Sequence, residues 1–172
     1  LGLTMHVLVT GHNGYIGTVL VPMLQARGHE VVGLDTDYFS RCLFAGSVPE
    51  VTSITKDVRD VEAQDVAGFD AVIHLAGLSN DPLGDYKPNL TEDINDKAAV
   101  RLARLAKEAG AQRFLFASSC SNYGAGGADF LDEQAAFNPV TPYGVSKVQV
   151  EAALHRLADA DFSPTYLRAS TA

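Results

Sequence analysis

The chain is poor in cysteine, in long apolar runs and in positive charge, and each shortage disfavours a class of protein. Its only two cysteines, Cys42 and Cys120, form neither a CxxC pair nor a disulfide framework, which suits a reducing, cytoplasmic compartment. No apolar run approaches the roughly 20 residues of a membrane span, and the apolar opening Leu1–Thr10 lacks the basic start and cleavage site of a signal peptide. A formal net charge of -8 disfavours nucleic acid and anionic membranes as partners.

What the chain does contain is a regular alternation of short β-branched runs with longer segments of helical period. The short runs predict six strands, at residues 5–10, 30–35, 51–57, 70–75, 113–117 and 165–168. Helices are expected at residues 15–27, about 88–109 and 141–160, with a polar loop, 79–88, before the second. This order predicts an α/β fold with a doubly wound parallel sheet, Rossmann-like, forming one domain over residues 1–172.

Three glycines follow the first predicted strand and open the first predicted helix. In such a motif Gly11 allows the tight turn, Gly14 lets backbone approach a pyrophosphate, and Gly17 allows close packing of the helix on the sheet. Asp35 ends the second strand about twenty residues later, where a carboxylate binds both hydroxyls of an adenosine ribose. The pattern predicts an NAD site rather than an NADP site, although Arg41 lies nearby. The alternatives are a ligand-free glycine turn and an Asp35 that only caps a loop.

Tyr143 and Lys147 are four residues apart on a predicted helix, so they lie on one face, one turn apart. A phenol with a pKa of about 10 is a poor base at neutral pH. An ammonium beside it favours the phenolate and lowers that pKa. The pair therefore predicts a usable proton donor and acceptor.

The glycine spacing, the Tyr-x-x-x-Lys pair and the segments between them resemble the extended short-chain dehydrogenase/reductase family. The closest likeness is to its NAD-dependent epimerase/dehydratase branch, which acts mostly on nucleotide sugars. The resemblance covers essentially the whole chain. Besides the two motifs it rests on Asp57-Val58, His74-Leu-Ala-Gly77, Asn95, Ser118-Ser-Cys-Ser-Asn-Tyr-Gly124 and Leu167-Arg168.

This resemblance implies NAD as the cofactor and assigns its contacts by position. Tyr15 and Ile16 are expected to place backbone amides on the pyrophosphate, and Asp57 and Val58 to meet the adenine. Asn95 is expected to steady the strand-four region from the long helix. The complete expected set is Gly11, Gly14, Tyr15, Ile16, Gly17, Asp35, Asp57, Val58, Leu75, Ala76, Gly77, Asn95, Tyr143 and Lys147.

The resemblance also implies a catalytic set of Ser119, Tyr143 and Lys147. Ser119 is expected to bind the reacting oxygen, unless it is an ordinary turn residue, while Tyr143 moves the proton and Lys147 holds charge and ribose. The 4,6-dehydratases of the family carry Asp-Glu directly after this serine, where the present chain has Cys120 and Ser121. Neither is a suitable acid for expelling water, so epimerisation or simple oxidoreduction is favoured. We expect Cys120 to be a buried, small apolar residue.

The predicted activity is that of an NAD-dependent epimerase or oxidoreductase, acting on a nucleotide sugar by hydride transfer with Tyr143 as acid and base. The alternatives are an NAD-dependent reductase or dehydrogenase of another carbonyl or alcohol, and a non-catalytic dinucleotide sensor. The smaller C-terminal domain that grips the substrate in this branch is not represented in these residues. No metal is expected, because His74 has no partner at ligand spacing and is interpreted as a packed structural histidine.

A homodimer is expected through an antiparallel pair of helices, over about 86–109 and 141–160, as in the enzymes that the chain resembles. Along the first helix one apolar stripe lies beside a second, a wider apolar surface than a single sheet-facing stripe needs. The alternative is that the same chain covers both stripes. They consist of Ala98, Leu102, Leu105 and Ala109, and of Ala99, Ala103 and Ala106.

Overall fold

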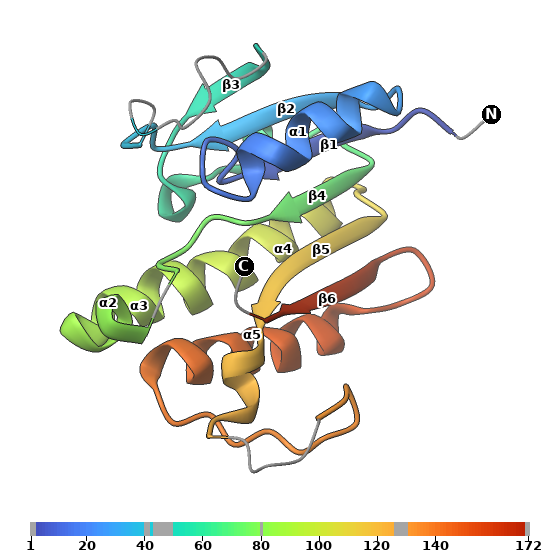
Figure 1. The fold of residues 1–172 in the computed structure, drawn as a ribbon. Helices are drawn as coiled ribbons and strands as arrows, with labels where there is room; N and C mark the ends of the chain where they lie inside the picture. The colour runs from blue at the N-terminus through green and yellow to red at the C-terminus, as the bar shows by residue number, and fades with distance from the viewer. Residues whose placement is uncertain (1–2, 40–41, 43–49, 80, 126–130, 171–172) are drawn as a thin grey trace.

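The computed structural model describes residues 3–39, 42, 50–79, 81–125 and 131–170. Its centre is a six-stranded parallel sheet in the order β3-β2-β1-β4-β5-β6, shown in Figure 1. The strands are β1 (His6–Thr10), β2 (Glu30–Asp35), β3 (Thr52–Thr55), β4 (Ala71–His74), β5 (Arg113–Ser119) and β6 (Ser163–Ala169). The predicted doubly wound sheet is confirmed. The last strand begins two residues earlier than predicted, because Ser163 and Pro164 continue the pairing with β5.

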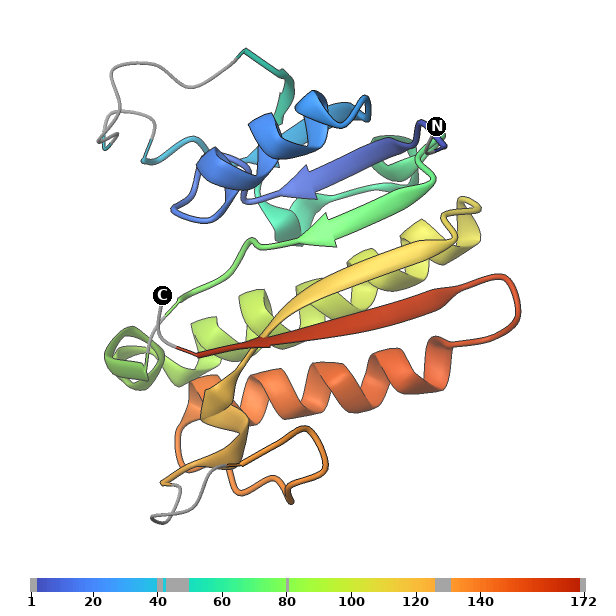
Figure 2. The same cartoon turned by 45° about the vertical axis from the view of Figure 1, so that its right-hand side comes forward.

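Helices lie on both faces of this sheet. Helix α1 (Gly17–Ala26) covers one face, and α4 (Ala98–Glu108) and α5 (Pro142–Leu157) cover the other, as Figures 1 and 2 show. Neighbouring strand residues are divided between two cores: Val7 and Val9 belong to the cluster with α1, and Leu8 to the cluster with α4 and α5. Continuous apolar runs in β1 and β4 follow from this, because a parallel sheet is buried on both sides.

The segment between β4 and β5 differs most from the prediction. The predicted loop 79–88 contains a helix, α2 (Asp81–Tyr86), and the predicted long helix is divided into α3 (Pro88–Thr91), a π-helical stretch, η3 (Glu92–Lys97), and α4. Lys87 separates α2 from α3 with φ -141° and ψ 78°, because the residue before a proline is disfavoured in the helical region. Among the described residues, no helix is long and apolar enough to cross a bilayer.

Three short 3-10 turns complete the described elements. They are η1 (Val58–Asp60), η2 (Ala63–Val66) and η4 (Cys120–Tyr123). Helix α5 begins at Pro142, in the first helical position where proline is favoured, and the Thr141 hydroxyl caps it by accepting from the Gly144 amide at 3.1 Å.

The apolar stripes of α4 are covered by the chain itself. Ala98, Leu102 and the whole second stripe are buried in the core shared with α5 and the sheet, and Leu105 and Ala109 pack partly against it. The width of the apolar surface on α4 therefore reflects its central place in the α4–α5 layer, and it no longer supports a subunit interface.

Candidate functional site at the carboxyl edge of the sheet

The glycine loop lies where the strand order reverses, between β1 and β4, the place at which open parallel sheets bind ligands. Gly11 has φ +75°, and its amide donates to the Leu34 carbonyl at 2.8 Å. A Cβ at Gly11 would lie 2.7 Å from the backbone nitrogen of Ala76. Only glycine therefore fits at position 11, between the end of β2 and the segment that follows β4. This close packing places the predicted cofactor residues 11–17 next to residues 75–77.

The other two glycines shape the turn into α1. A Cβ at Gly17 would lie 2.5 Å from the Gly11 carbonyl oxygen, so this glycine allows the helix to start against the loop's own backbone rather than against a strand. Gly14 donates to the same carbonyl at 3.0 Å, and a Cβ added to Gly14 would meet only that oxygen, at 3.2 Å. The side chains of Tyr15 and Ile16 are exposed at the start of α1. The turn that carries the residues expected at a pyrophosphate, here called the glycine cradle, thus has Tyr15 and Ile16 at the surface.

Asp35 links the end of β2 to this loop. Its carboxylate accepts from the backbone amide of Asn13 at 3.1 Å and from that of Asp37 at 3.0 Å. Asp37 has φ +62°, and its own carboxylate accepts from the Asn13 side chain at 3.0 Å. Two carboxylates therefore stand beside the glycine loop, where they would repel an added phosphate; the contact of Asp35 with a ribose remains a prediction.

The two residues predicted to contact the adenine, Asp57 and Val58, differ in their surroundings. The Asp57 carboxylate caps η1 and forms an ion pair with Arg59 at 2.7 Å, and the hydrogen bond from Arg59 lowers the pKa of this carboxyl. The Val58 side chain is buried in the core. Val58 can therefore meet a ligand only through its backbone.

Asn95 fastens the segment after β4 to the π-helical stretch η3. It is 2% exposed, accepts from the Leu78 amide at 2.7 Å and donates to the Leu78 carbonyl at 3.0 Å. A Cβ at Gly77 would lie 2.9 Å from the Asn95 side-chain oxygen. The contact expected between Asn95 and the strand-four region is thus present, and its bearing on cofactor binding remains a prediction.

His74 is a packed residue, as the sequence indicated. It is 1% exposed, its Nδ1 lies 2.6 Å from the Thr10 hydroxyl, and its ring stacks near Phe116. Burial and the charge of Lys147 lower the pKa of His74 to about 3, so the ring is neutral at physiological pH.

Ser119, Tyr143 and Lys147 meet at the same carboxyl edge. Ser119 is the last residue of β5, and its hydroxyl accepts from the Ser121 amide at 3.1 Å as the cap of η4. A Cβ at Gly144 would lie 2.7 Å from the Ser121 carbonyl oxygen, so the first turn of α5 packs directly on this turn. Tyr143, the neighbour of Gly144, thus belongs to the helical turn that packs on η4.

Lys147 is the buried cation of this group. Its Nζ donates to the Ala117 carbonyl at 2.7 Å and lies 5.4 Å from the centre of the Tyr143 ring and 4.6 Å from that of Phe116. Burial lowers the pKa of Lys147 to about 8. The ammonium of Lys147 thus lies near the Tyr143 ring, and the acid/base role of this tyrosine remains a prediction.

The expectation that Cys120 is buried is wrong, because its side chain is exposed. The chain leaves β5 at Ser119 and turns at once into η4, which directs the next side chain outward. Two further residues of the sequence analysis, Asn80 in the predicted polar loop and Arg41 near Asp35, lie outside the described residues.

Sequence reasoning missed Glu151, a carboxylate that is 4% exposed and lies one turn of α5 beyond Lys147. The signal was available in the spacing, since residues 143, 147 and 151 recur every four positions and share a helix face. Its contacts connect to Ser118 and Asn122, beside Ser119.

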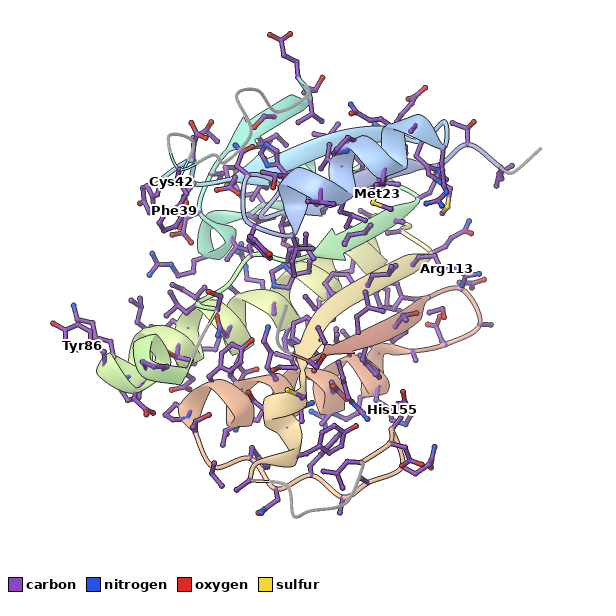
Figure 3. All side chains as sticks on the ribbon, viewed as in Figure 1. Met23, Phe39, Cys42, Tyr86, Arg113 and His155 are labelled. Atoms are coloured by element: carbon purple, nitrogen blue, oxygen red, sulfur yellow. The ribbon has the colours of Figure 1, made fainter. Side chains whose placement is uncertain are left out.

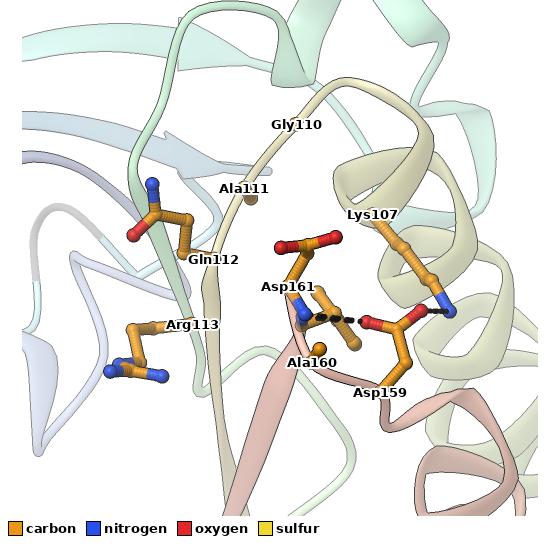
Figure 4. A pocket seen from close by; sticks show the side chains of 9 residues that line it. Lys107, Gly110, Ala111, Gln112, Arg113, Asp159, Ala160 and Asp161 are labelled. Carbon is orange, nitrogen blue, oxygen red and sulfur yellow. Dashed lines mark hydrogen bonds and ion pairs between the residues drawn. The ribbon is translucent and has the colours of Figure 1, made fainter.

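The larger of two pockets among the described residues lies away from this carboxyl edge. It has a volume of about 610 Å³ at the amino ends of β5 and β6, and the Lys107–Asp159 ion pair, at 2.6 Å, borders it, as Figure 4 shows. No residue of the predicted site lines it. The exposed aromatic side chains Phe39 and Tyr86 stand instead at the carboxyl edge, opposite Arg113 at the start of β5, as Figure 3 shows.

A parallel sheet of this order, a glycine cradle at its reversal point and a Ser/Tyr/Lys group on the adjoining strand and helix define a dinucleotide-dependent enzyme domain. Residues 7–172 match the model of the NAD dependent epimerase/dehydratase family, and the chain belongs to that family. NAD is therefore the cofactor to which the cradle corresponds.

Relatives and solved structures agree with this assignment. A UDP-glucose 4-epimerase of Streptomyces lividans is 33% identical over 162 residues, which are 87% of this chain and 48% of that protein. The UDP-N-acetylglucosamine 4-epimerase from Methanobrevibacter ruminantium, solved with UDP-N-acetylmuramic acid, superposes with a TM-score of 0.87 at 26% identity over 97% of this chain and 55% of the other. The UDP-glucose 4-epimerase of Thermus thermophilus, solved with NAD, gives 0.81 at 29% identity, over 95% and 54%. The chain spans about half the length of the curated relatives it matches.

Proposed function

We propose that the protein containing this chain is an NAD-dependent epimerase of a nucleotide sugar, with Ser119, Tyr143 and Lys147 as its catalytic residues. One observation carries the proposal: the Gly144–Ser121 contact holds the serine and the Tyr/Lys pair at one edge, beside the glycine cradle. The two residues after Ser119 are Cys120 and Ser121, so the Asp-Glu pair that the family's 4,6-dehydratases carry is missing at these positions. UDP-glucose 4-epimerases among the relatives support the same choice.

The cofactor fits the residues at the cradle. Gly11 and Gly14 keep the turn that packs on Ala76 free of side chains, Asp35 would face a ribose, and Asp57 would stand at the adenine end. The segment 75–77, which precedes the Leu78–Asn95 hydrogen bonds, would form the floor on the nicotinamide side. When bound, NAD supplies the acceptance and return of hydride that side chains cannot perform.

The proton chemistry belongs to the chain itself. Ser119 can donate a hydrogen bond to the reacting sugar oxygen while the Tyr143 phenolate accepts its proton, helped by the ammonium of Lys147. In the second half of an epimerisation the carbonyl carbon is reduced on its opposite face, and the same oxygen regains the proton. One tyrosine therefore serves both half-reactions, and no NAD is consumed in the cycle.

The second candidate is an NAD-dependent reductase or dehydrogenase of another carbonyl or alcohol. It uses the same three residues, and the absence of a carboxylate at Cys120 and Ser121 fits it equally well. The two functions differ in cofactor balance, since a dehydrogenase releases NADH stoichiometrically and an epimerase does not.

The deciding experiment incubates the full-length protein with UDP-glucose and with UDP-galactose separately, following the sugars by NMR and NADH by absorbance. Interconversion without net NADH supports the epimerase. Conversion of neither sugar, together with stoichiometric NADH from a simple alcohol, supports the second candidate. Stoichiometric NADH from a UDP-sugar, or a 4-keto-6-deoxy product, would contradict both.

We also propose that the protein is a cytoplasmic homodimer. The apolar stripes of α4 are covered by the chain itself, so the proposed contact is the outer side of α5 and not the pair of helices α4 and α5 expected from the sequence. The two cysteines, Cys42 and Cys120, are free, in keeping with a reducing compartment. The support for an interface is the outer side of α5, where Val145 is exposed and Val148 is only partly buried.

A further inference from the structure

The carboxylate of Glu151 is buried beneath the catalytic edge and bonded on every side. Its Oε1 accepts from the Ser118 hydroxyl at 2.5 Å and from the Asn122 side-chain amide at 2.8 Å. Arg168 donates to both carboxylate oxygens, with its shortest bond, Nη2 to Oε2, at 2.7 Å. A charge removed from water must regain its hydrogen bonds from the protein, so these contacts tie the three partners firmly to α5.

Arg168 extends the network to the segment around residues 131–138. It donates to the Tyr123 hydroxyl at 2.9 Å and to the Glu133 carbonyl at 3.1 Å, and its guanidinium lies 4.6 Å from the centre of the Phe137 ring. The hydrogen bond to Glu151 raises the pKa of Arg168, which keeps it charged. The network therefore joins the end of β5, η4, α5, β6 and this segment.

Three successive turns of α5 contact the end of β5 along one face. Gly144 meets the Ser121 carbonyl, Lys147 donates to the Ala117 carbonyl, and Glu151 accepts from Ser118. The first two contacts involve backbone atoms, and the third is a bond between side chains that can be removed without altering either main chain. Ser118 directly precedes Ser119, so this bond fixes the strand end on which the catalytic hydroxyl stands.

We propose that Glu151 is a positioning residue: through Ser118 and Asn122 it sets the place of Ser119 relative to Tyr143 and Lys147. The assignment rests on the proposed function, because it concerns the efficiency of that catalytic group. Glu151 is buried and acts on the reaction only through Ser119 and its turn.

The test uses two variants of the full-length protein. Ser118→Ala removes one bond to the carboxylate and leaves the Arg168 pair intact, and Glu151→Asp keeps the charge but shortens its reach by one methylene. Each should lower kcat by a factor on the order of 10 to 10², as small misplacements of catalytic groups do, with KM changed by less than about twofold. Lys107→Gln, which breaks the ion pair at the opposite edge, is the matched control and should leave kcat unchanged.

A double-mutant cycle separates positioning from a general loss of structure. With Ser119→Ala as background, Ser118→Ala should cost less than about twofold, because the group it positions is already absent. A merely structural defect would lower kcat by the same factor in both backgrounds, and that result would overturn the proposal.

Hydrogen–deuterium exchange of residues 117–124 gives a readout that does not depend on turnover. Exchange there should rise in Ser118→Ala and in Glu151→Asp but not in Lys107→Gln; unchanged exchange in the two variants also overturns the proposal. If the wild-type protein turns over no nucleotide sugar, the proposed function fails, and the exchange data still decide whether Glu151 holds this turn.

Discussion

The Asp35 carboxylate accepts a hydrogen bond from the backbone amide of Asn13 at 3.1 Å, so the acidic end of β2 and the glycine loop form one unit. Because this carboxylate disfavours a 2′-phosphate, the protein should bind NAD(H) more tightly than NADP(H). Asp35→Ser should weaken NAD(H) binding and reduce the preference, whereas Asp161→Asn, at the far edge, should change neither. Titration of both cofactors measures this, and equal or tighter binding of NADP(H) by the wild type would show that Asp35 does not select the cofactor.

Tyr143→Phe removes the phenol hydroxyl and keeps the ring near Lys147. In the full-length protein, turnover should fall by a factor on the order of 10² or more, since the proton carrier is lost, while NAD binding stays nearly intact. Steady-state kinetics and cofactor titration check the two halves of this prediction. Near wild-type turnover would mean that another group carries the proton.

Lys147 should make the stability of the protein rise with pH. Its pKa is about 8 in the folded chain against 10.5 for the free side chain, so between these values the unfolded chain binds more protons than the folded one. The free energy of unfolding should therefore increase by about 3 kcal/mol across that window, at about 1.4 kcal/mol per pKa unit. Urea unfolding of the wild type and of Lys147→Met, both without cofactor, measures the free energy of unfolding at several pH values. A difference in free energy between the two proteins that does not change with pH would refute the prediction.

Cys120 is exposed next to Ser119, which makes its role open to a direct test. Because Cys120 is assigned no part in proton transfer, Cys120→Ser should keep kcat within about twofold of wild type. Ser119→Ala serves as the comparison and should be far more damaging. A loss on the order of 10² in Cys120→Ser would make the thiol an acid or base of the reaction.

The homodimer proposal predicts that the full-length protein sediments as a dimer at micromolar concentration. Val145→Glu, on the outer side of α5, should weaken association, because it places charge in the proposed apolar contact. Ala152→Ser on the same helix is a mild control. A fully active monomer in sedimentation would exclude this interface.

The parts of the site that follow from local spacing were predictable from the sequence. Gly11 with its positive φ, Asp35 at the end of β2, and Tyr143 one turn from Lys147 all depend on residues close together along the chain. Short-range geometry of this kind is dictated by backbone sterics and helical period.

The remaining features depend on partners distant in sequence. The spacing of Glu151 places it on the same helix face as Lys147, but its burial and its hydrogen bonds depend on Ser118 and Arg168, which come from β5 and β6. The outward direction of Cys120 depends on how η4 leaves the strand. The alanines of α4 could face either a partner or the chain's own sheet, a choice that only tertiary packing makes.

The order of the elements along the chain means that the two halves of the sheet are synthesised one after the other. The strands β3, β2, β1 and β4 all come from residues 6–74, whereas β5, α5 and β6 follow later. On the ribosome, where N-terminal parts fold first, the glycine loop and Asp35 emerge before Ser119 and Tyr143 have been translated. The four strands of the cofactor half are therefore complete before the catalytic residues are made, but one of their faces stays uncovered until α4 and α5 follow.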